Sequence, residues 1–506
     1  MRSSSSGIAV RTDYLIAWLL PMFAGAGVFA LLSSARRRSG DIVAAFGAGW
    51  LVGIAMAALL SCKLGAIDTS SVTSRAWPWL AGLGALAWIA ALIRSRIAHA
   101  RRGSAGPRSD GAMPANGQPS PALIALCLLL IALVLMRVWL LADEASLRPL
   151  FPWDAWSAWA IKAKTWMLLG EAQPYVKMVD WLTNPDPALR TAATWRYPEG
   201  LAWMQVWFAS GAGEWNEPLV NLAWCGALVA FALAAYGYWR GFGLSPWLAL
   251  ALVYAFVSLP LVDAHVALAG YADLWLAVML GAAVLAWTRW MLRRERGQWL
   301  LAVALALTLP AIKLEGSAWL FVFSIVVVLD LLPARGRRLV GGSAVVLLAI
   351  GLIAGGFVLP VLGVGPVHVS WKSIGIPLLG SFDLVWHPVG GAMLAGLFTL
   401  PNWHLLWYAV PAIVIARHAM LRRDHASRML GLLVLLQAFL LFVLFFFTDA
   451  SAWAQDYTSA NRLILQIVPT VFVFIAVLLR EGARSTGFSS SAIDRPRGLG
   501  RPISAA

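Results

Sequence analysis

Long apolar runs recur along the whole 506-residue chain and constrain its fold more than any other feature. Each is long enough to cross a bilayer as a helix, and only helices and closed barrels satisfy their backbone groups within lipid. Since 60% of the residues are hydrophobic, an ordinary soluble domain is excluded. Two shorter stretches, 198–212 and 389–401, are expected to be interfacial helices on the outer face. We predict an all-α polytopic membrane protein with about thirteen spans, at 14–34, 41–61, 76–93, 122–142, 218–239, 245–262, 271–292, 298–312, 315–333, 339–362, 402–418, 429–448 and 462–480.

The distribution of basic residues predicts the orientation of these spans. The net charge of +15 would suggest a nucleic-acid partner in a soluble protein, but here we expect none, because arginines anchor cytoplasmic loops. One set of loops holds 25 of the 39 basic residues, all arginine, and all six lysines fall on the other side. The arginine side is predicted to be cytoplasmic, with the N-terminus outside and the C-terminus inside. Its arginines lie at Arg36–Arg38, Arg94–Arg108, Arg240, Arg289–Arg296, Arg335–Arg338, Arg417–Arg428 and from Arg480 onward.

Composition also divides the chain. Residues 1–102 carry three predicted N-terminal transmembrane helices, and residues 103–121 form a Gly/Pro/Ser-rich stretch expected to be a flexible cytoplasmic linker. Residues 122–480 form the main transmembrane core, whose largest outer loop runs over 143–197. The polar segment 481–506 is expected to be a disordered cytoplasmic tail. No internal repeat is evident, which counts against transporters built from inverted repeats.

The stretch FPWDAWSAWAIKAKTWMLLG, residues 151–170, opens the predicted outer loop and is unusually polar for this chain. Asp154 stands among Trp153, Trp156 and Trp159, whose spacing of three would place the indoles on roughly one side of a helix. Such a group suits a sugar platform with a carboxylate beside it. Tryptophans at an interface equally often serve as anchors.

Other ionisable residues fall at the outer ends of separate predicted spans. Lys162 and Lys164 are two positions apart and should diverge on a helix, so that at most one faces a site. A single outer carboxylate is commonly a helix cap, and a lysine there can snorkel to the surface. Several such residues at several span ends are harder to explain, because ionisable groups near lipid are costly and tend to be functional. The others are Asp273 in GYADLW, Lys313 and Glu315 in KLEG, Tyr197 and Glu199 in WRYPEG, and Arg462.

The order of these motifs resembles a known family. WDAWSAWAIKAK, YPEG, GYADLWLA, KLEG and NRLILQIVPT follow one another over about residues 122–480. They are similar to segments of the GT-C superfamily of integral-membrane glycosyltransferases, which includes protein mannosyltransferases and the aminoarabinose transferases of lipid A. The resemblance implies a GT-C-like fold with its active site on the periplasmic side. A polytopic chain rich in arginine and alanine with short loops is typical of bacteria, so we expect a bacterial inner membrane. It also implies a polyprenyl-phosphate sugar donor and an inverting transfer.

The resemblance carries over to individual positions. Asp154 matches the acid that serves the acceptor, and Arg462 and Lys313 match places where relatives meet the lipid phosphate. Tyr197 to Glu199 stand where many relatives have a His-Pro-Pro-like segment, and no second acid lies beside Asp154. Both departures count against a protein acceptor but do not exclude it. The acceptor therefore stays open between an envelope glycan, a lipid and a protein.

A chemical role for each residue follows. Asp154 would take the proton from an acceptor hydroxyl, and cations would stabilise the charge growing on the leaving phosphate. No spaced ligand motif demands a metal, although a divalent cation, Mg²⁺ or Mn²⁺, stays open. We expect Arg462, Lys313 and Lys162 to bind the donor phosphate, and Trp153, Trp156, Tyr197, Glu199, Asp273 and Glu315 to bind substrate.

Three other functions compete with the transferase. A transporter or flippase for a lipid-linked sugar needs charges in mid-membrane and gates on both faces. Arg137 is the clearest internal charge, but the cytoplasmic side offers only arginine loops, and this asymmetry favours an enzyme open to one side. A polysaccharide polymerase or ligase would concentrate arginine in large outer loops, whereas this chain places most arginines on the other side. An envelope scaffold would not need acids at several outer span ends.

Overall fold

Helices make up most of the molecule. Nine of the described helices are long and apolar enough to cross a membrane, and a bent pair, α9 (Pro246–Val257) and α10 (Pro260–Ala267), adds a tenth candidate broken by 61°. This confirms a mainly helical, multi-pass membrane architecture. The structure, a computed structural model, describes residues 12–34, 39–65, 68–103, 120–361, 365–377 and 380–480.

The three N-terminal helices pack directly on the rest of the bundle. They are α1 (Thr12–Leu32), α2 (Asp41–Leu64) and α3 (Val72–Gly103). Glycines allow this close approach: a Cβ on Gly53 would lie 1.8 Å from the carbonyl oxygen of Pro21. Gly47 of α2 likewise lies against the backbone of Ala230 in α8 (Glu217–Phe242).

Two helices form the centre of the bundle. In α11 (Ala272–Arg293) 94% of the best apolar window is buried, and in α20 (Ser459–Leu479) 89% is buried. By contrast, α4 (Pro121–Leu147) is largely exposed, with 6% buried, as expected for a helix that faces lipid. The central pair therefore supplies fixed positions from which polar side chains can be held.

The predicted count of thirteen spans is matched in part. The segments 298–312, 315–333 and 402–418 are helical, but their helices have only 17, 17 and 11 residues. The predicted linker and tail fall mostly on 104–119 and 481–506, which lie outside the described residues. The helices that lie between α11 and α20 in the sequence are α12 (Arg296–Ile312), α13 (Glu315–Leu331), α14 (Ala334–Ile353), α15 (Gly390–Leu394), η2 (Ala395–Thr399), α16 (Leu406–Ala416), α17 (His418–Arg423), α18 (His425–Phe447) and α19 (Ser451–Gln455).

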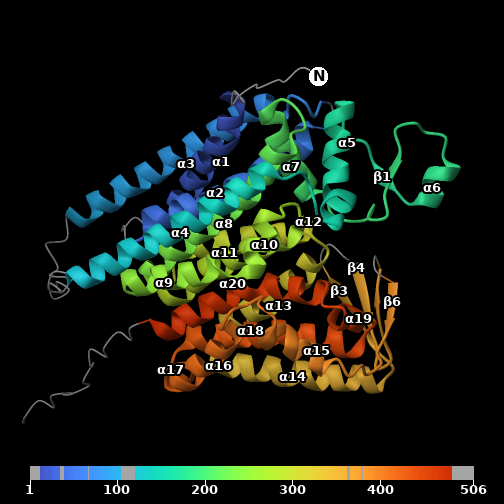
Figure 1. Ribbon diagram of the computed structural model, residues 1–506. Coiled ribbons are helices and arrows are strands. Elements are labelled where there is room, and N and C mark those ends of the chain that lie inside the picture. The colour runs from blue at the N-terminus through green and yellow to red at the C-terminus, as the bar shows by residue number, and fades with distance from the viewer. Residues whose placement is uncertain are drawn as a thin grey trace, which may run out of the picture.

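The segment between α4 and α8 folds into short elements at one end of the bundle (Figure 1). Its last helix is the predicted stretch 198–212, which is helical but does not lie at an interface: twelve of its thirteen residues are buried inside the protein. Its small residues, such as Gly211 against Ala17, allow it to pack among other helices. The elements are η1 (Ala155–Ala160), α5 (Ile161–Leu169), β1 (Tyr175–Val176), α6 (Met178–Thr183), β2 (Arg190–Thr191) and α7 (Gly200–Ala212).

A small antiparallel sheet lies at the same end of the molecule (Figure 1). The prediction of an all-α chain does not hold for this segment, and the predicted span 339–362 lies earlier in the sequence, because its helix, α14, covers Ala334–Ile353. Gly355 and Gly356 have φ of +98° and +132°, which ends the helix, and the following valine- and proline-rich segment forms extended strands. The four strands pair in sequence order: β3 (Phe357–Val361), β4 (Gly365–Val369), β5 (Ser373–Ile376) and β6 (Gly380–Asp383).

Candidate functional site

A buried carboxylate, Asp273, is the centre of a cluster of charged side chains. It lies in the first turn of α11 and its side chain has no exposed surface. Its Oδ1 accepts hydrogen bonds from Lys313 Nζ at 2.9 Å and Gln466 Nε2 at 2.6 Å. Its Oδ2 accepts from Arg462 Nε at 3.1 Å and Nη2 at 2.9 Å. Three elements that are distant in sequence therefore meet on one side chain.

Arg462 extends this cluster to the protein surface. Its Nη1 donates to Asp154 Oδ2 at 2.6 Å, and its guanidinium carbon lies 4.0 Å from the centre of the Tyr271 ring. The exposed fraction rises from 0% at Asp273 to 13% at Arg462 and 42% at Asp154. The cluster is thus closed at Asp273 and open to its surroundings at Asp154.

Lys313 and Glu315 form the other arm of the cluster, in the turn between α12 and α13. Lys313 Nζ lies 3.0 Å from Glu315 Oε1, and Glu315 is 29% exposed. Burial alone would lower the pKa of Lys313, but the nearby carboxylates of Asp273 and Glu315 outweigh it and raise that pKa. Lys313 is therefore held firmly in its charged form.

Aromatic side chains border the cluster. The buried Trp159 ring lies 6.0 Å from Lys313 Nζ and meets the Tyr197 ring edge-on at 5.5 Å. Burial raises the pKa of the Tyr197 hydroxyl, and the carboxylate of Glu315 raises it further. Burial likewise raises the pKa of Tyr271, so both phenols stay protonated as hydrogen-bonding groups.

The conformation of residues 153–160 explains how Asp154 reaches the cluster. Residues Ala155–Ala160 form a π-helical turn, with wider spacing than an α-helix. The prediction that three tryptophans share one side was wrong for this reason: Trp153 and Trp156 are 69% and 43% exposed, whereas Trp159 is 2% exposed. Gly270, at a φ of +117°, lets this turn pack closely, since a Cβ there would lie 2.3 Å from Ala155 Cβ.

Lys162 lies outside the cluster and holds a neighbouring loop. Its Nζ donates to the carbonyls of Trp195 at 3.0 Å and Tyr197 at 2.8 Å, and lies 3.7 Å from Glu199 Oε1. Burial lowers the pKa of Lys162, and Glu199 partly opposes this effect. With a side chain only 2% exposed, Lys162 contacts the loop that carries Tyr197 and not the ion cluster.

The predicted divergence of the two lysines is confirmed. Lys164 points away from Lys162 and pairs with Glu217 at 2.9 Å, where it is 48% exposed. Trp153 and Trp156 contact each other at 4.6 Å between ring centres on the outside of the π-helical turn. Of the predicted site residues, the structure joins five in the ion cluster, namely Asp154, Asp273, Lys313, Glu315 and Arg462.

Gln466 and Tyr271 belong to the site but were not predicted from the sequence. Gln466 donates to Asp273 and accepts from Trp319 Nε1 at 2.6 Å, so it supports the buried carboxylate from behind. A signal was present, since Gln466 follows Arg462 by four residues and lies on the same face of a helix.

A divalent cation would compete with lysine and arginine in this cluster. Among the described residues, no group of three or more His, Cys, Asp and Glu side chains could hold a metal ion. Each of the three carboxylates already contacts Lys313 or Arg462, so these side chains supply the positive charge that Mg²⁺ or Mn²⁺ would otherwise supply.

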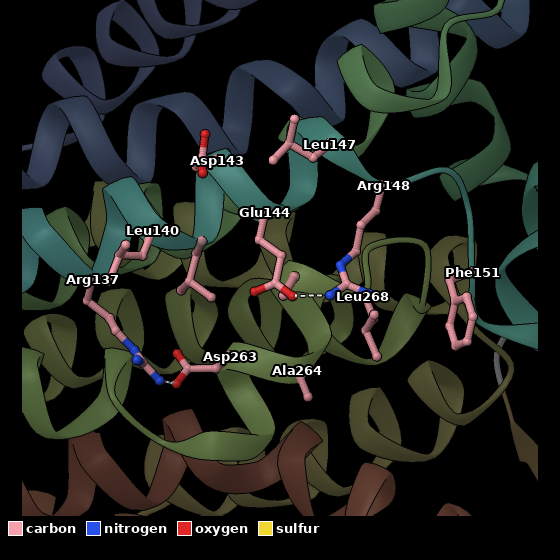
Figure 2. Close-up of a pocket in the computed structure, with 12 residues that line it drawn as sticks. Arg137, Leu140, Asp143, Glu144, Leu147, Arg148, Phe151, Asp263, Ala264 and Leu268 are labelled. Carbon is pink, nitrogen blue, oxygen red and sulfur yellow. Dashed lines mark ion pairs between the residues drawn. The ribbon is translucent and has the colours of Figure 1, made fainter.

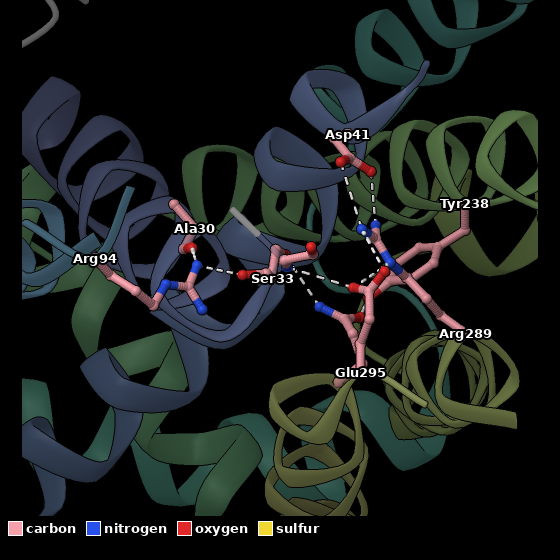
Figure 3. Close-up of polar contacts among 9 residues, drawn as sticks. Ala30, Ser33, Asp41, Arg94, Tyr238, Arg289 and Glu295 are labelled. Atoms are coloured by element: carbon pink, nitrogen blue, oxygen red, sulfur yellow. Dashed lines mark hydrogen bonds and ion pairs between the residues drawn. The ribbon is translucent and has the colours of Figure 1, made fainter. Parts of the chain in front are cut away.

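A second buried ion network lies near the opposite end of α11 (Figure 3). Arg289 Nη1 donates to Asp41 Oδ1 at 2.7 Å, and Arg289 Nε donates to Glu295 Oε2 at 3.0 Å. The three side chains are only 4%, 10% and 9% exposed. This network ties α2 to the α11–α12 turn.

Further polar side chains complete that second network. Tyr238 donates to Gln298 Oε1 at 2.6 Å, and Gln298 donates in turn to Ser33 Oγ at 3.1 Å. Arg94 of α3 donates to the carbonyl of Ala30 at 2.8 Å. Helices α1, α2, α3, α8 and α12 therefore meet at this end, which gives the network a clear structural role.

Comparison of the chain with protein-family models, with curated proteins and with solved structures finds no match. The resemblance to GT-C glycosyltransferases therefore stays an expectation, resting on the motifs of the sequence.

Proposed function

We propose that this chain is a membrane glycosyltransferase that moves a sugar from a polyprenyl-phosphate donor to an acceptor hydroxyl. The observation that carries the proposal is the ion cluster in which Arg462 joins the half-exposed Asp154 to the buried Asp273. The proposal includes a GT-C-like fold and transfer on the periplasmic face of a bacterial inner membrane, as the topology and motifs of the sequence suggest.

The free-energy cost of removing these charged groups from water argues that the ion cluster has a function. Removing charges from water costs several kcal/mol per ion, about what their mutual attraction returns. A network that only ties helices together can be sealed, as the one around Arg289 is, yet Asp154 and Glu315 keep 42% and 29% of their side chains exposed. Perturbed, interacting charges that open to a surface are typical of catalytic sites.

In the proposed reaction, Asp154 acts as the general base. Arg462 binds its Oδ2 and fixes the carboxylate, so that Oδ1 can accept the proton of the acceptor hydroxyl. The hydroxyl oxygen forms a bond to the anomeric carbon while the bond from that carbon to the phosphate oxygen breaks. Its electron pair leaves on the lipid phosphate, and a single displacement of this kind inverts the anomeric centre.

The two cations have different access to the phosphate. Lys313 is 5% exposed and touches two carboxylates, so it acts through Asp273. Arg462 is 13% exposed and pairs with the more exposed Asp154, so a phosphate oxygen can approach it from that side. We therefore assign stabilisation of the leaving phosphate to Arg462 and the support of Arg462 to Asp273 and Lys313.

The test is sugar transfer by the purified protein in nanodiscs, with a panel of polyprenyl-phosphate sugars as donors and membrane lipids and envelope glycans as acceptors. Wild type is expected to form product, and an Arg462→Lys variant to form far less, since lysine cannot hold both carboxylates in a fork. Donor binding is measured in parallel. A well-folded wild type that neither turns over nor binds any donor would contradict the proposal, whereas transmembrane movement of a lipid-linked sugar would favour the transporter.

A further inference from the structure

A cleft lined by charged and apolar side chains opens between α4 and α10 (Figure 2), and its lining includes no member of the ion cluster. Its volume is about 900 Å³. Arg137, Glu144 and Arg148 line it from α4 and its C-terminus, Asp263 and Ala264 line it from α10, and Phe151 lies at its end. Most of α4 is apolar and exposed, so this charged strip departs from the rest of the helix.

The charges within the cleft are balanced in pairs. Arg137 forms an ion pair with Asp263, and Arg148 pairs with Glu144 at 2.6 Å. Figure 2 shows Asp143, a further lining residue, pointing away from both arginines. A lining in which each guanidinium is matched by a carboxylate attracts neither a phosphate nor a cation strongly. It offers donors and acceptors side by side, which is the arrangement that neutral hydroxyl groups satisfy.

The charged part of the lining extends along α4. Arg137 and Arg148 are eleven residues apart, or about 16 Å along a helix, which is about half of a bilayer's hydrocarbon thickness. Arg137 is 37% exposed and Asp263 is 11% exposed, so the pair farther from Arg148 still borders the cleft. Charged groups within membrane-spanning helices usually face water-filled cavities and mark substrate paths. A ligand in the cleft meets both ion pairs and leucine side chains, which suits the hydroxyl groups and the apolar ring faces of a sugar.

Two residues of the cleft lining are close in sequence to the turn that carries the proposed catalytic carboxylate. Phe151 lines the cleft, is 68% exposed and lies three residues before Asp154. Leu268, also in the lining, lies two residues before Gly270, which contacts Ala155 at the start of the π-helical turn. An exposed aromatic ring next to paired polar groups suits the apolar face of a sugar ring.

We propose that this cleft binds a neutral, hydroxyl-rich carbohydrate chain and presents its end to Asp154. The cleft is thus the acceptor site, and the acceptor is a glycan. The role of the cleft as the acceptor site rests on the proposed transferase function, whereas its binding of carbohydrate does not.

Binding is tested by saturation-transfer difference NMR on the full chain in a sugar-free detergent, since alkyl glycosides would compete. The probes are two neutral oligosaccharides, maltohexaose and a β-1,3-glucan hexamer. Wild type is expected to transfer saturation to at least one probe. Ala264→Trp, which fills the cleft, should abolish the signal, and the double variant E144Q/R148Q should reduce it at least fivefold. Ala132→Trp on an exposed part of α4 outside the cleft lining is the matched control and should keep the signal.

Two outcomes would overturn the proposal: no saturation transfer from folded wild type to either probe, or signals from Ala264→Trp and E144Q/R148Q equal to wild type. Because both side chains of the double variant are more than 40% exposed, it should fold even if the tryptophan variant does not. If the protein binds the oligosaccharide but transfers no sugar, the proposal of a carbohydrate-binding cleft stands and the proposed transferase function is contradicted. If the cleft variants still transfer sugar with an unchanged acceptor KM, the transferase function stands and the cleft is not the acceptor site.

Discussion

Two buried ion networks lie towards opposite ends of the same central helix, and they differ in one property. Asp273 and Arg289 are sixteen residues apart in α11, or about 24 Å along its axis. Around Arg289 all three charged side chains are at most 10% exposed. Around Asp273 the network ends on Asp154, which is 42% exposed.

This difference separates a structural tie from a candidate site. A sealed network can only hold helices together, and removing one member leaves the other charges buried. An open network holds its inner members equally firmly but presents one prepared carboxylate to a ligand. Substitutions at the Arg289 end should therefore change stability, and those at the Asp154 end should change activity.

The largest expected effect on stability is at Arg289. Arg289→Gln removes the guanidinium from between Asp41 and Glu295 and should lower the free energy of unfolding by about 3–5 kcal/mol. Denaturant unfolding in detergent measures this loss. The remaining folded protein should transfer sugar at the wild-type rate. Arg480→Gln, which removes a less buried pair with Asp424, is the control and should cost clearly less. If the two variants lost the same free energy of unfolding, the structural role assigned to the sealed network would be contradicted.

A pair of glycine substitutions sharpens the comparison. Gly297 contacts the carbonyl oxygen of Leu32 near the sealed network, and Gly270 contacts Ala155 near the open one. Each change to alanine overpacks its contact and should cost about 1–3 kcal/mol of stability. Only Gly270→Ala should also lower kcat, because it displaces the turn that carries Asp154. Steady-state kinetics with both folded variants checks this prediction. An equal kcat for Gly270→Ala and Gly297→Ala would show that Gly270 does not support the site.

The smallest expected effects distinguish two neighbouring lysines. Lys162→Gln leaves the partly buried carbonyls of Trp195 and Tyr197 without their ammonium donor and should cost about 1–3 kcal/mol. Lys164→Gln breaks an exposed pair with Glu217 and should cost about 0–1 kcal/mol. Thermal unfolding of the two variants measures the difference. A larger loss from Lys164 would contradict the assigned contacts.

Much of the helical architecture was predictable, because apolar runs and arginine loops reflect lipid directly. The failures have local causes. The Gly355–Gly356 pair ends α14 early and begins a sheet, and apolarity alone could not separate α7, buried in protein, from a helix lying on lipid. Hydropathy reports contact with any apolar medium, so it cannot tell a protein neighbour from a lipid neighbour.

The site was partly predictable for a related reason. Ionisable residues at span ends stand out in an apolar chain, and this signal found Asp154, Asp273, Lys313 and Arg462. Which of them touch depends on how distant helices pack, which the sequence pattern does not state. The central place of Asp273 and the loop-holding role of Lys162 therefore emerged only from the structure.

The most direct test of the account measures sugar transfer and unfolding together for Asp154→Asn. We expect transfer to fall by about 10²–10⁴-fold, the usual range for loss of a general base. The unfolding temperature should stay near that of wild type, because Asp154 is half-exposed while Asp273 keeps Arg462 paired. Asp180→Asn on the exposed helix α6 is the control and should change neither quantity. Wild-type transfer by Asp154→Asn, or loss of folding in step with loss of transfer, would contradict the account.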